Sequence, residues 1–166
     1  MGGFMDKKLE KILNEQITKE IASSYLYLGM AAYFDAENLS GCAKWMKVQA
    51  KEEMNHGMKI FEYMADKGLH VALGAIEKPE NSFKSAKDAF EKTLVHEKKV
   101  TASIDNIYKT AKDVGDSSTE IFMHWFVIEQ VEEEKNAIEV LAMLAKVKED
   151  SASMILLDKE LGRRGE

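Results

Sequence analysis

Four long segments of the chain carry apolar residues at helical spacing, with polar residues between them. At about 100° per residue, the apolar positions of each segment gather on one face, as in amphipathic helices. A fifth, shorter segment near the C-terminus has the same character. The predicted helices cover about residues 6–35, 42–67, 85–112, 119–147 and 151–161. The pattern therefore predicts an all-α fold.

Polar and glycine residues mark the ends of these segments. Asp6 is expected to cap the first helix, and Ser117 or Ser118 to cap the fourth. Gly68 and Gly162 lie where the second and fifth helices should end. The last residues, 163–166, are expected to be frayed.

The connections predict how the helices run relative to one another. Short turns join the first helix to the second and the third to the fourth, so each pair should be antiparallel. Residues 69–83 connect the second helix to the third, and this segment spans roughly 50 Å when extended. That length allows a crossover along the whole bundle, with the second and third helices parallel. We expect one four-helix-bundle domain over residues 1–166, with a short fifth helix.

Each long apolar stripe contains an acidic residue near its middle. These residues are Glu20, Glu53, Glu97 and Glu133, and His56 follows Glu53 by three positions on the same face. The middle of a helix lies at the same position along the bundle axis whichever direction the helix runs, so all five side chains can meet. Buried carboxylates need a counter-charge, and no Lys or Arg lies near them on these stripes. Carboxylates with one imidazole suit iron, manganese or zinc, so we predict a metal centre in which Glu53 can bridge two ions.

The fourth segment supplies further acidic residues around the predicted metal centre. Glu129, Gln130 and Glu133 lie within about 100° of arc, and Glu132 flanks them. Neighbouring apolar residues indicate that Glu129 and Glu133 face the core. Glu132 fits a solvated acidic face equally well.

Aromatic side chains near the predicted metal centre allow two interpretations. Tyr27 and Trp125 are either plain core aromatics or donors of an electron or a hydrogen bond at the site. His96 points about 100° away from Glu97, so it is not expected to be a ligand. His70 and His124 give no strong indication of a role.

Composition narrows the function classes. The net charge of -6 and the pI of about 5.4 disfavour nucleic acid as a partner and are compatible with attracting cations. No apolar run reaches ~18 residues, so a membrane span is not expected. Cys42 is the single cysteine and is expected to be a packed side chain. Residues 1–5 lack a signal-peptide core, so we expect a cytoplasmic protein, with Met5 as an alternative start.

Together these motifs resemble the ferritin family, specifically the non-haem prokaryotic ferritins. The matching stretches are Leu13–Gln16 before Glu20, Tyr25–Tyr27, Trp45-Met46, Glu52-Glu53 with His56, His96-Glu97, Trp125–Glu134 and Leu157–Leu161. Asn136 stands where a second Glu-x-x-His motif would place its histidine, which separates the chain from haem-binding bacterioferritins. Haem is therefore not expected, although Met54 occupies the position of the bacterioferritin haem-ligating methionine.

The resemblance implies a shell of twenty-four subunits that oxidises Fe(II) with O2 or H2O2 and stores ferric mineral. Residue by residue, it implies one iron on Glu20, Glu53 and His56, and a second on Glu53, Glu97 and Glu133. Gln130 would hydrogen-bond near oxygen or bound water, and Tyr27 and Trp125 would lie beside the centre. A third iron site is implied at Glu52, Glu129, Glu132 and Glu133. Asp116 and Glu120, at the expected start of the fourth helix, are candidate acids of an iron entry channel.

Two other function classes compete with this interpretation. One is a discrete di-iron oxidase or peroxidase of the rubrerythrin type, without a storage cavity. A single cysteine excludes the Cys-rich site that classical members add. The other is a structural helical bundle without metal, which predicts that substituting Glu53 or His56 would stabilise the fold and leave iron binding unchanged.

Overall fold

The computed structural model describes residues 5–148 and 150–165, and within them it contains five helices and no strand. The helices are α1 (Lys7–Ala36), α2 (Ser40–Asp66), α3 (Ala86–Asp113), α4 (Ser117–Leu144) and α5 (Ala152–Leu161). The expected all-α fold is confirmed. The alternative start at Met5 depends on residues 1–4, which lie outside the described part of the chain. No helix among the described residues has the length and apolarity needed to cross a membrane.

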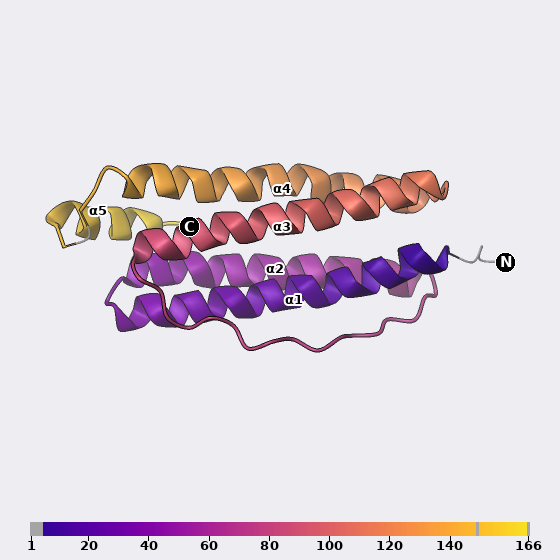
Figure 1. Ribbon diagram of the computed structural model, residues 1–166, viewed down its shortest axis with the longest axis horizontal. Coiled ribbons are helices and arrows are strands. Elements are labelled where there is room, and N and C mark those ends of the chain that lie inside the picture. The colour runs from indigo at the N-terminus through magenta and orange to yellow at the C-terminus, as the bar shows by residue number, and fades with distance from the viewer. Residues whose placement is uncertain (1–4, 149, 166) are drawn as a thin grey trace.

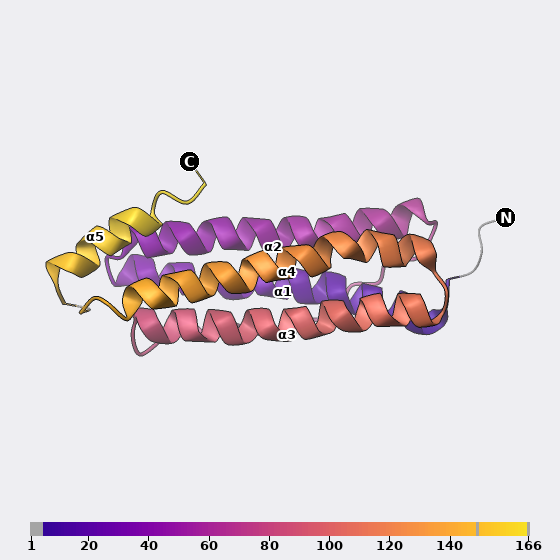
Figure 2. The same cartoon turned by 90° about the horizontal axis from the view of Figure 1, so that it is seen from above.

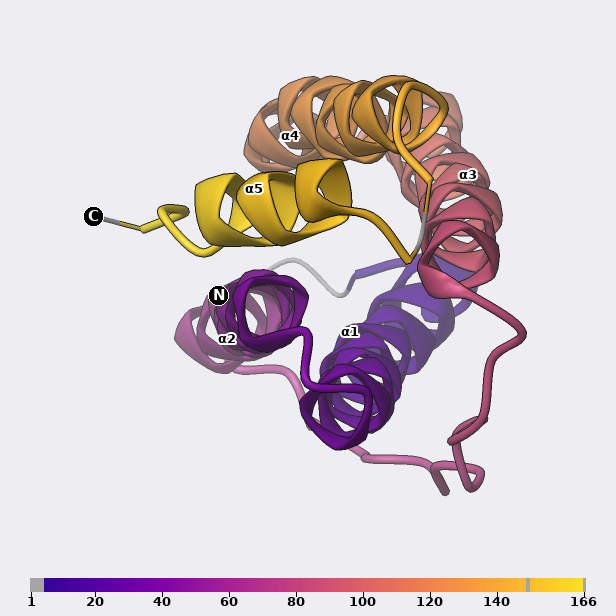
Figure 3. The same ribbon diagram turned by 90° about the vertical axis from the view of Figure 1, so that its left-hand side faces the viewer.

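The four long helices form two antiparallel hairpins, α1 with α2 and α3 with α4 (Figure 1). Residues 67–85 return along the outside of the bundle, so α2 and α3 run parallel, as Figures 1 and 2 show. Seen end-on, the long helices occupy four corners, and α5 lies between the ends of α2 and α4 (Figure 3). The predicted long crossover is therefore confirmed.

Two side chains of α1 hold the crossover. Asn14 Oδ1 accepts from the backbone N–H of Ala72 (2.7 Å), and its Nδ2 donates to the carbonyl of His70 (3.2 Å). One turn later, Thr18 Oγ1 accepts from Gly74 N (2.9 Å). Backbone polar groups without a strand or helix partner need such side chains, so an extended connection can lie against the bundle.

The apolar core consists of two clusters rather than one. The first lies toward α5 and includes Phe34, Trp45 and Phe90. The second lies toward the start of α1 and includes Leu13 and Ile60. The residues predicted to form the metal centre lie between the two clusters, at the middle of the long helices.

The start of α4 differs from the prediction. The helix begins at Ser117, and its N-cap is Asp116 rather than Ser117 or Ser118. The Asp116 carboxylate accepts from Thr119 N (3.0 Å) and from Lys67 Nζ (2.9 Å). A carboxylate suits the positive end of a helix dipole, and Lys67 adds a partner that the serine hydroxyls could match less strongly. These hydrogen bonds hold the pKa of Asp116 below its ordinary value despite partial burial.

The end of α4 also differs, because the helix stops at Leu144 instead of continuing to 147. Lys146 N donates to Met143 O (3.0 Å) and Val147 N donates to Leu144 O (3.3 Å). These shorter-range bonds tighten the chain into a turn, which leads toward α5.

The start of α2 depends on α5. The helix begins at Ser40, two residues earlier than expected, and Leu39 provides no side-chain cap. Instead, the Asp158 carboxylate accepts from Gly41 N (3.0 Å) and Cys42 N (2.8 Å). A Cβ on residue 41 would lie 1.7 Å from the Asp158 carbonyl oxygen, so glycine permits the close approach. Cys42 is fully buried, as predicted for a packed side chain.

The prediction of a frayed C-terminal tail is wrong for Arg164. Its Nη2 lies 2.5 Å from Glu52 Oε2, and its guanidinium carbon lies 4.1 Å from the centre of the Trp45 ring. An ion pair and a ring contact fix this side chain against α2, which a sequence pattern of adjacent charges does not reveal.

Candidate metal centre

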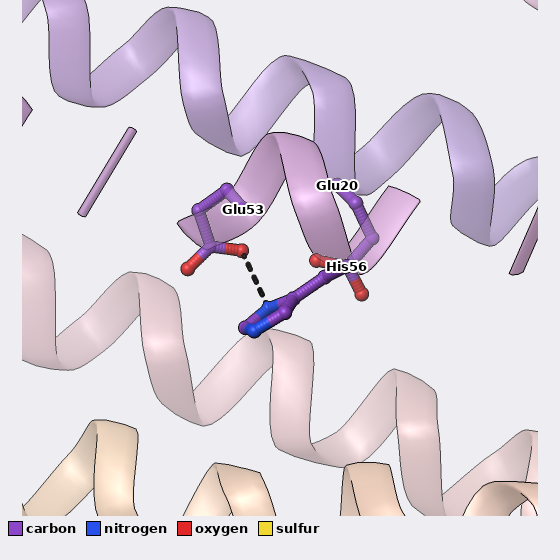
Figure 4. A group of neighbouring side chains, drawn as sticks. All are labelled: Glu20, Glu53 and His56. Atoms are coloured by element: carbon purple, nitrogen blue, oxygen red, sulfur yellow. Dashed lines mark ion pairs between the residues drawn. The ribbon is translucent and has the colours of Figure 1, made fainter. Parts of the chain in front are cut away.

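The four acids and the histidine predicted from the sequence meet in one buried layer. Each is at most 5 % exposed, and they come from all four long helices: Glu20, Glu53, His56, Glu97 and Glu133. Figure 4 shows the side chains of Glu20, Glu53 and His56 beside one another, with an ion pair between Glu53 and His56. The layer interrupts the core between the two apolar clusters.

Donor atoms in this layer form two groups that share one residue. The first group is Glu20, Glu53 and His56, and the second is Glu53, Glu97 and Glu133. Within each group, the donor atoms all lie within 4.8 Å of one another. Because Glu53 belongs to both, its carboxylate is placed to bridge two metal ions. This is the arrangement expected from the register of the acids in the helices.

The layer concentrates negative charge with little compensation. The pKa of Glu20 is raised first by burial and then by the charge of Glu53. The pKa of Glu53 is raised first by burial and then by the charges of Glu97 and Glu133. Burial and then the charge of Glu97 raise the pKa of Glu133 to about 7. Within the described residues, the only basic side chain within 4.0 Å of these acids is His56, with Nδ1 3.5 Å from Glu53 Oε2. Bound cations would supply the missing charge.

Two buried carboxylate oxygens have no hydrogen-bond donor among the described residues. They are Oε2 of Glu20 and Oε2 of Glu53. Buried acceptors in folded proteins are normally satisfied, so such atoms require an explanation. A hard cation is the partner that fits their chemistry and the donor set around them.

Two glutamines that orient these acids were not identified as site residues from the sequence. Gln16 Nε2 donates to Glu20 Oε1 (2.7 Å), and Gln49 Nε2 donates to both Glu53 Oε1 (2.8 Å) and Glu133 Oε2 (2.8 Å). In each helix the glutamine precedes its glutamate by four residues, one helical turn. This repeated Gln-x-x-x-Glu spacing is the signal that could have found them. Such partners fix the orientation of metal-binding side chains.

Tyr27 and Gln130 hold Glu97 from two sides. The Tyr27 hydroxyl donates to Glu97 Oε1, and burial raises the pKa of Tyr27, which keeps this donor protonated. Gln130 Nε2 lies 3.3 Å from Glu97 Oε2 and 3.3 Å from the Glu97 carbonyl oxygen. Both predicted residues therefore lie at the layer and position one of its carboxylates.

The other aromatic and histidine candidates lie at the edges of the layer. Trp125 is 38 % exposed, with its ring centre 5.3 Å from that of His56. His96 Nε2 lies 2.7 Å from Ser23 Oγ, and burial lowers the pKa of His96 to about 4. His96 is in none of the donor groups found among the described residues.

Only part of the predicted third site is assembled. His56, Glu129 and Glu133 form a third group of donor atoms within 4.8 Å of one another. Glu52 and Glu132 are outside this group. Glu52 pairs instead with Arg164, and Glu132 is exposed on α4. Beside the group lies a surface cavity of about 480 Å³, whose walls include Glu52, His56, Trp125 and Glu129.

The remaining candidates lie away from this layer. Asp116 is committed to the α4 N-terminus and Lys67, and Glu120 Oε1 accepts from the Tyr108 hydroxyl (3.2 Å). Met54 is 39 % exposed on α2.

Comparisons with known proteins agree with this fold. The profile of the Ferritin family, described as a ferritin-like domain, matches residues 10–147. A probable bacterial non-heme ferritin-like protein of Haemophilus influenzae is 38 % identical over 159 residues, 96 % of each chain. A bacterial non-heme ferritin of Staphylococcus aureus is 37 % identical over 161 residues, 97 % of each chain.

Solved structures give the same result. An open pore ferritin from the hyperthermophilic archaeon Archaeoglobus fulgidus superposes with a TM-score of 0.95 at 41 % identity, over 97 % of this chain and 99 % of that one. An engineered closed form of the same archaeal ferritin gives a TM-score of 0.94 at 42 % identity, over 97 % and 98 %. The matching family profile, relatives and bundle show that the chain belongs to the ferritin family of iron-storage proteins.

Proposed function

We propose that this protein oxidises Fe(II) at the mid-bundle layer and stores the ferric product inside a cage built from copies of the chain, in the cytoplasm. The observation that carries the proposal is the sharing of Glu53 by two buried donor groups. A pair of adjacent irons is the substrate that such a site accommodates.

The roles of the layer residues follow from their positions. Glu20, Glu53 and His56 would bind one iron, and Glu53, Glu97 and Glu133 the other. Carboxylates attract Fe(III) more strongly than Fe(II), because the attraction grows with metal charge. Binding here therefore favours oxidation. Two irons together can give O2 two electrons, and with two protons these yield H2O2.

Metal binding at this site should also be coupled to the release of protons. The carboxyl groups of the layer have raised pKa values, so part of them carry protons when no metal is bound. Metal binding requires ionised carboxylates and should release these protons. Tyr27, Gln16, Gln49 and Gln130 would then keep the ionised groups in place through their hydrogen bonds.

The assembly and the oxidant are inferred from resemblance. The structural neighbour is described as an open pore ferritin, which supports a cage for this chain. Twenty-four copies, and O2 or H2O2 as oxidant, are the expectations of the family. A third metal on Glu129 and Glu133 would lie between the buried pair and the surface cavity, with the His56 imidazole kept as a ligand of the first iron.

Aerobic loading with Fe(II) tests the proposal. Several hundred irons per expected cage would be added, and soluble ferric iron co-eluting with protein on a sizing column would be measured. We expect co-elution with a very large particle and fast oxidation that is lost in Glu53→Ala. Glu139→Ala is the control, because Glu139 is a surface acid paired with Lys135. Oxidation of about two irons per chain followed by precipitation would favour a discrete di-iron oxidase. Absence of protein-dependent oxidation would refute the ferroxidase assignment.

A further inference from the structure

α5 and the segment after it contact one stripe of α2 that leads toward the metal layer. Asp158 binds the N–H groups of Gly41 and Cys42, and Arg164 lies over the Trp45 ring. A Cβ built on Gly165 would contact Val48 at 3.5 Å, and Arg164 reaches Glu52. Positions 41, 45, 48 and 52 of α2 share one helix face. Figure 2 shows α5 and the segment that follows it next to the first part of α2.

Arg164 contacts this stripe at two points, Trp45 and Glu52. Its guanidinium carbon lies 4.1 Å from the centre of the Trp45 ring, and its Nη2 lies 2.5 Å from Glu52 Oε2. The Trp45 ring packs in turn against Phe90, with ring centres 5.1 Å apart. The Arg164 side chain is only 17 % exposed, although it lies in a chain end. Arginine stacked on an aromatic ring and paired with a carboxylate keeps a defined orientation.

The partner of Arg164 is the residue that links this stripe to the metal layer. Glu52 precedes Glu53 in α2 and lines the surface cavity that also contacts His56 and Glu129. Its charge contributes to the raised pKa of Glu133, so the two carboxylates are close enough to interact. Glu52 is nevertheless absent from the donor group formed by His56, Glu129 and Glu133.

We propose that Arg164 is a positioning residue that holds Glu52 away from a metal ion bound by Glu129 and Glu133 at the edge of the layer, the third site. A cation at this third site would gain Glu52 as a ligand only by displacing the guanidinium. Arg164 thereby weakens metal binding at the third site relative to the buried pair. Weaker binding there favours the passage of metal toward the surface cavity lined by Glu52 and Glu129. This inference rests on the proposed function, because it assumes that the layer binds metal.

Titration of the metal-free protein with Zn²⁺ tests the inference without any redox activity. Calorimetry would resolve the two buried ions from a weaker third one. In Arg164→Gln we expect the third ion to bind about three to ten times more tightly, because Glu52 loses its competing partner. Arg163→Gln is the matched control, since the Arg163 side chain is 72 % exposed and its one ion pair within the described residues is with Glu160, near the end of α5. The control should leave all Zn²⁺ affinities unchanged.

A second pair of variants separates positioning from a general effect on folding. In the Glu52→Gln background, Arg164→Gln should no longer change the third affinity. Arg164→Lys keeps the charge but not the planar pairing, so its third affinity should lie between those of the unmodified protein and Arg164→Gln. Thermal unfolding of each variant confirms that it is folded.

Two results would overturn the inference while leaving the proposed function intact. One is an unchanged third affinity in Arg164→Gln with two tightly bound ions still present. The other is an equal gain with and without Glu52, which would show that Arg164 acts by its general charge. Absence of the two tight ions in the unmodified protein would refute the proposed function, and the inference with it.

Discussion

The middle of the bundle and its two ends are built on opposite principles. Toward α5, Phe34, Trp45 and Phe90 are buried with ring centres 5.1–5.8 Å apart, so this region is stabilised by apolar packing. In the middle, carboxylates occupy the positions that such side chains would otherwise fill. The ends therefore provide the stability that permits a layer of buried, like-charged groups between them.

The hydrogen bonds of the layer show how the metal-free protein tolerates this charge. Gln49 donates to Glu53 and to Glu133, and thereby places an amide between two carboxylates. Gln16 donates a hydrogen bond to a single carboxylate oxygen, Oε1 of Glu20. Amides relieve part of the repulsion but supply no net charge. The layer should consequently be destabilising without metal and stabilising with metal, whereas the ends should be indifferent to metal.

Truncating an aromatic ring in the α5-side cluster should have the largest effect on stability. Phe90 is fully buried against Phe34 and Trp45. Phe90→Ala should lower the free energy of unfolding by about 3–5 kcal/mol, because it opens a cavity. Denaturant unfolding of the metal-free protein measures this change. The stabilisation gained on adding Zn²⁺ should remain as large as in the unmodified protein; a loss of it would contradict the separation between ends and middle.

The pH dependence of the metal-free protein should report the layer. The folded-state pKa of Glu133, about 7, is above its ordinary value of 4.5, so the folded protein retains a proton that the unfolded chain releases. This contribution to stability is full below pH 4.5 and is lost as pH rises through 7, by about 3 kcal/mol. Unfolding would be measured between pH 4.5 and 8.

Glu133→Gln is the matched variant for this measurement. It removes the titrating group but keeps His96, whose lowered pKa acts in the opposite sense as pH falls from 6.5 to 4. The difference between the two proteins should therefore report Glu133 together with the part of the raised Glu53 pKa that the Glu133 charge causes. Parallel pH profiles for the two proteins would argue against a strained carboxyl group at this position.

Neutralising the shared carboxylate should raise stability and remove the response to metal. At pH 8, Glu53→Gln should stabilise the metal-free protein by about 1–2 kcal/mol, because it relieves buried repulsion. Zn²⁺ should then add little further stability. Glu139→Gln, at a surface position, should change stability by less than about 0.5 kcal/mol and preserve the Zn²⁺ effect. Thermal unfolding with and without Zn²⁺ would compare them, and an undiminished Zn²⁺ effect in Glu53→Gln would refute the bridging role.

Removing an orienting amide should have the smallest effect. Gln49→Leu takes away the donor to Glu53 and Glu133 while preserving a similar volume. We expect a loss of about 1 kcal/mol in the metal-free protein and roughly tenfold weaker Zn²⁺ binding. Calorimetric titration beside the unmodified protein checks the affinity. Unchanged binding would show that the carboxylates are positioned by the helices alone.

The layer was predictable from the sequence because one periodicity determines it. Glu20, Glu53, Glu97 and Glu133 each lie on an apolar stripe at mid-helix, and burial of the stripes brings them together. Helix length and short turns likewise predicted the hairpins and the crossover. These features depend on residues one or two turns apart, which a sequence displays directly.

Contacts between distant segments could not be predicted in the same way. Asp158 caps a helix that begins more than a hundred residues earlier, and Arg164 pairs with Glu52 at a separation of 112 residues. Lys67 similarly favours Asp116 over the neighbouring serines as the α4 cap. Such choices depend on which surfaces meet after folding, and no local pattern in the chain encodes them.

If the mid-bundle layer oxidises iron as proposed, it binds two metal ions that share Glu53. X-ray diffraction from crystals loaded anaerobically with Fe(II), collected at the iron absorption edge, tests it most directly. We predict two anomalous peaks about 3.5–4 Å apart, one beside Glu20 and His56, the other beside Glu97 and Glu133, with Glu53 between them. Iron peaks confined to the protein surface, with none inside the layer, would show that the layer does not bind iron.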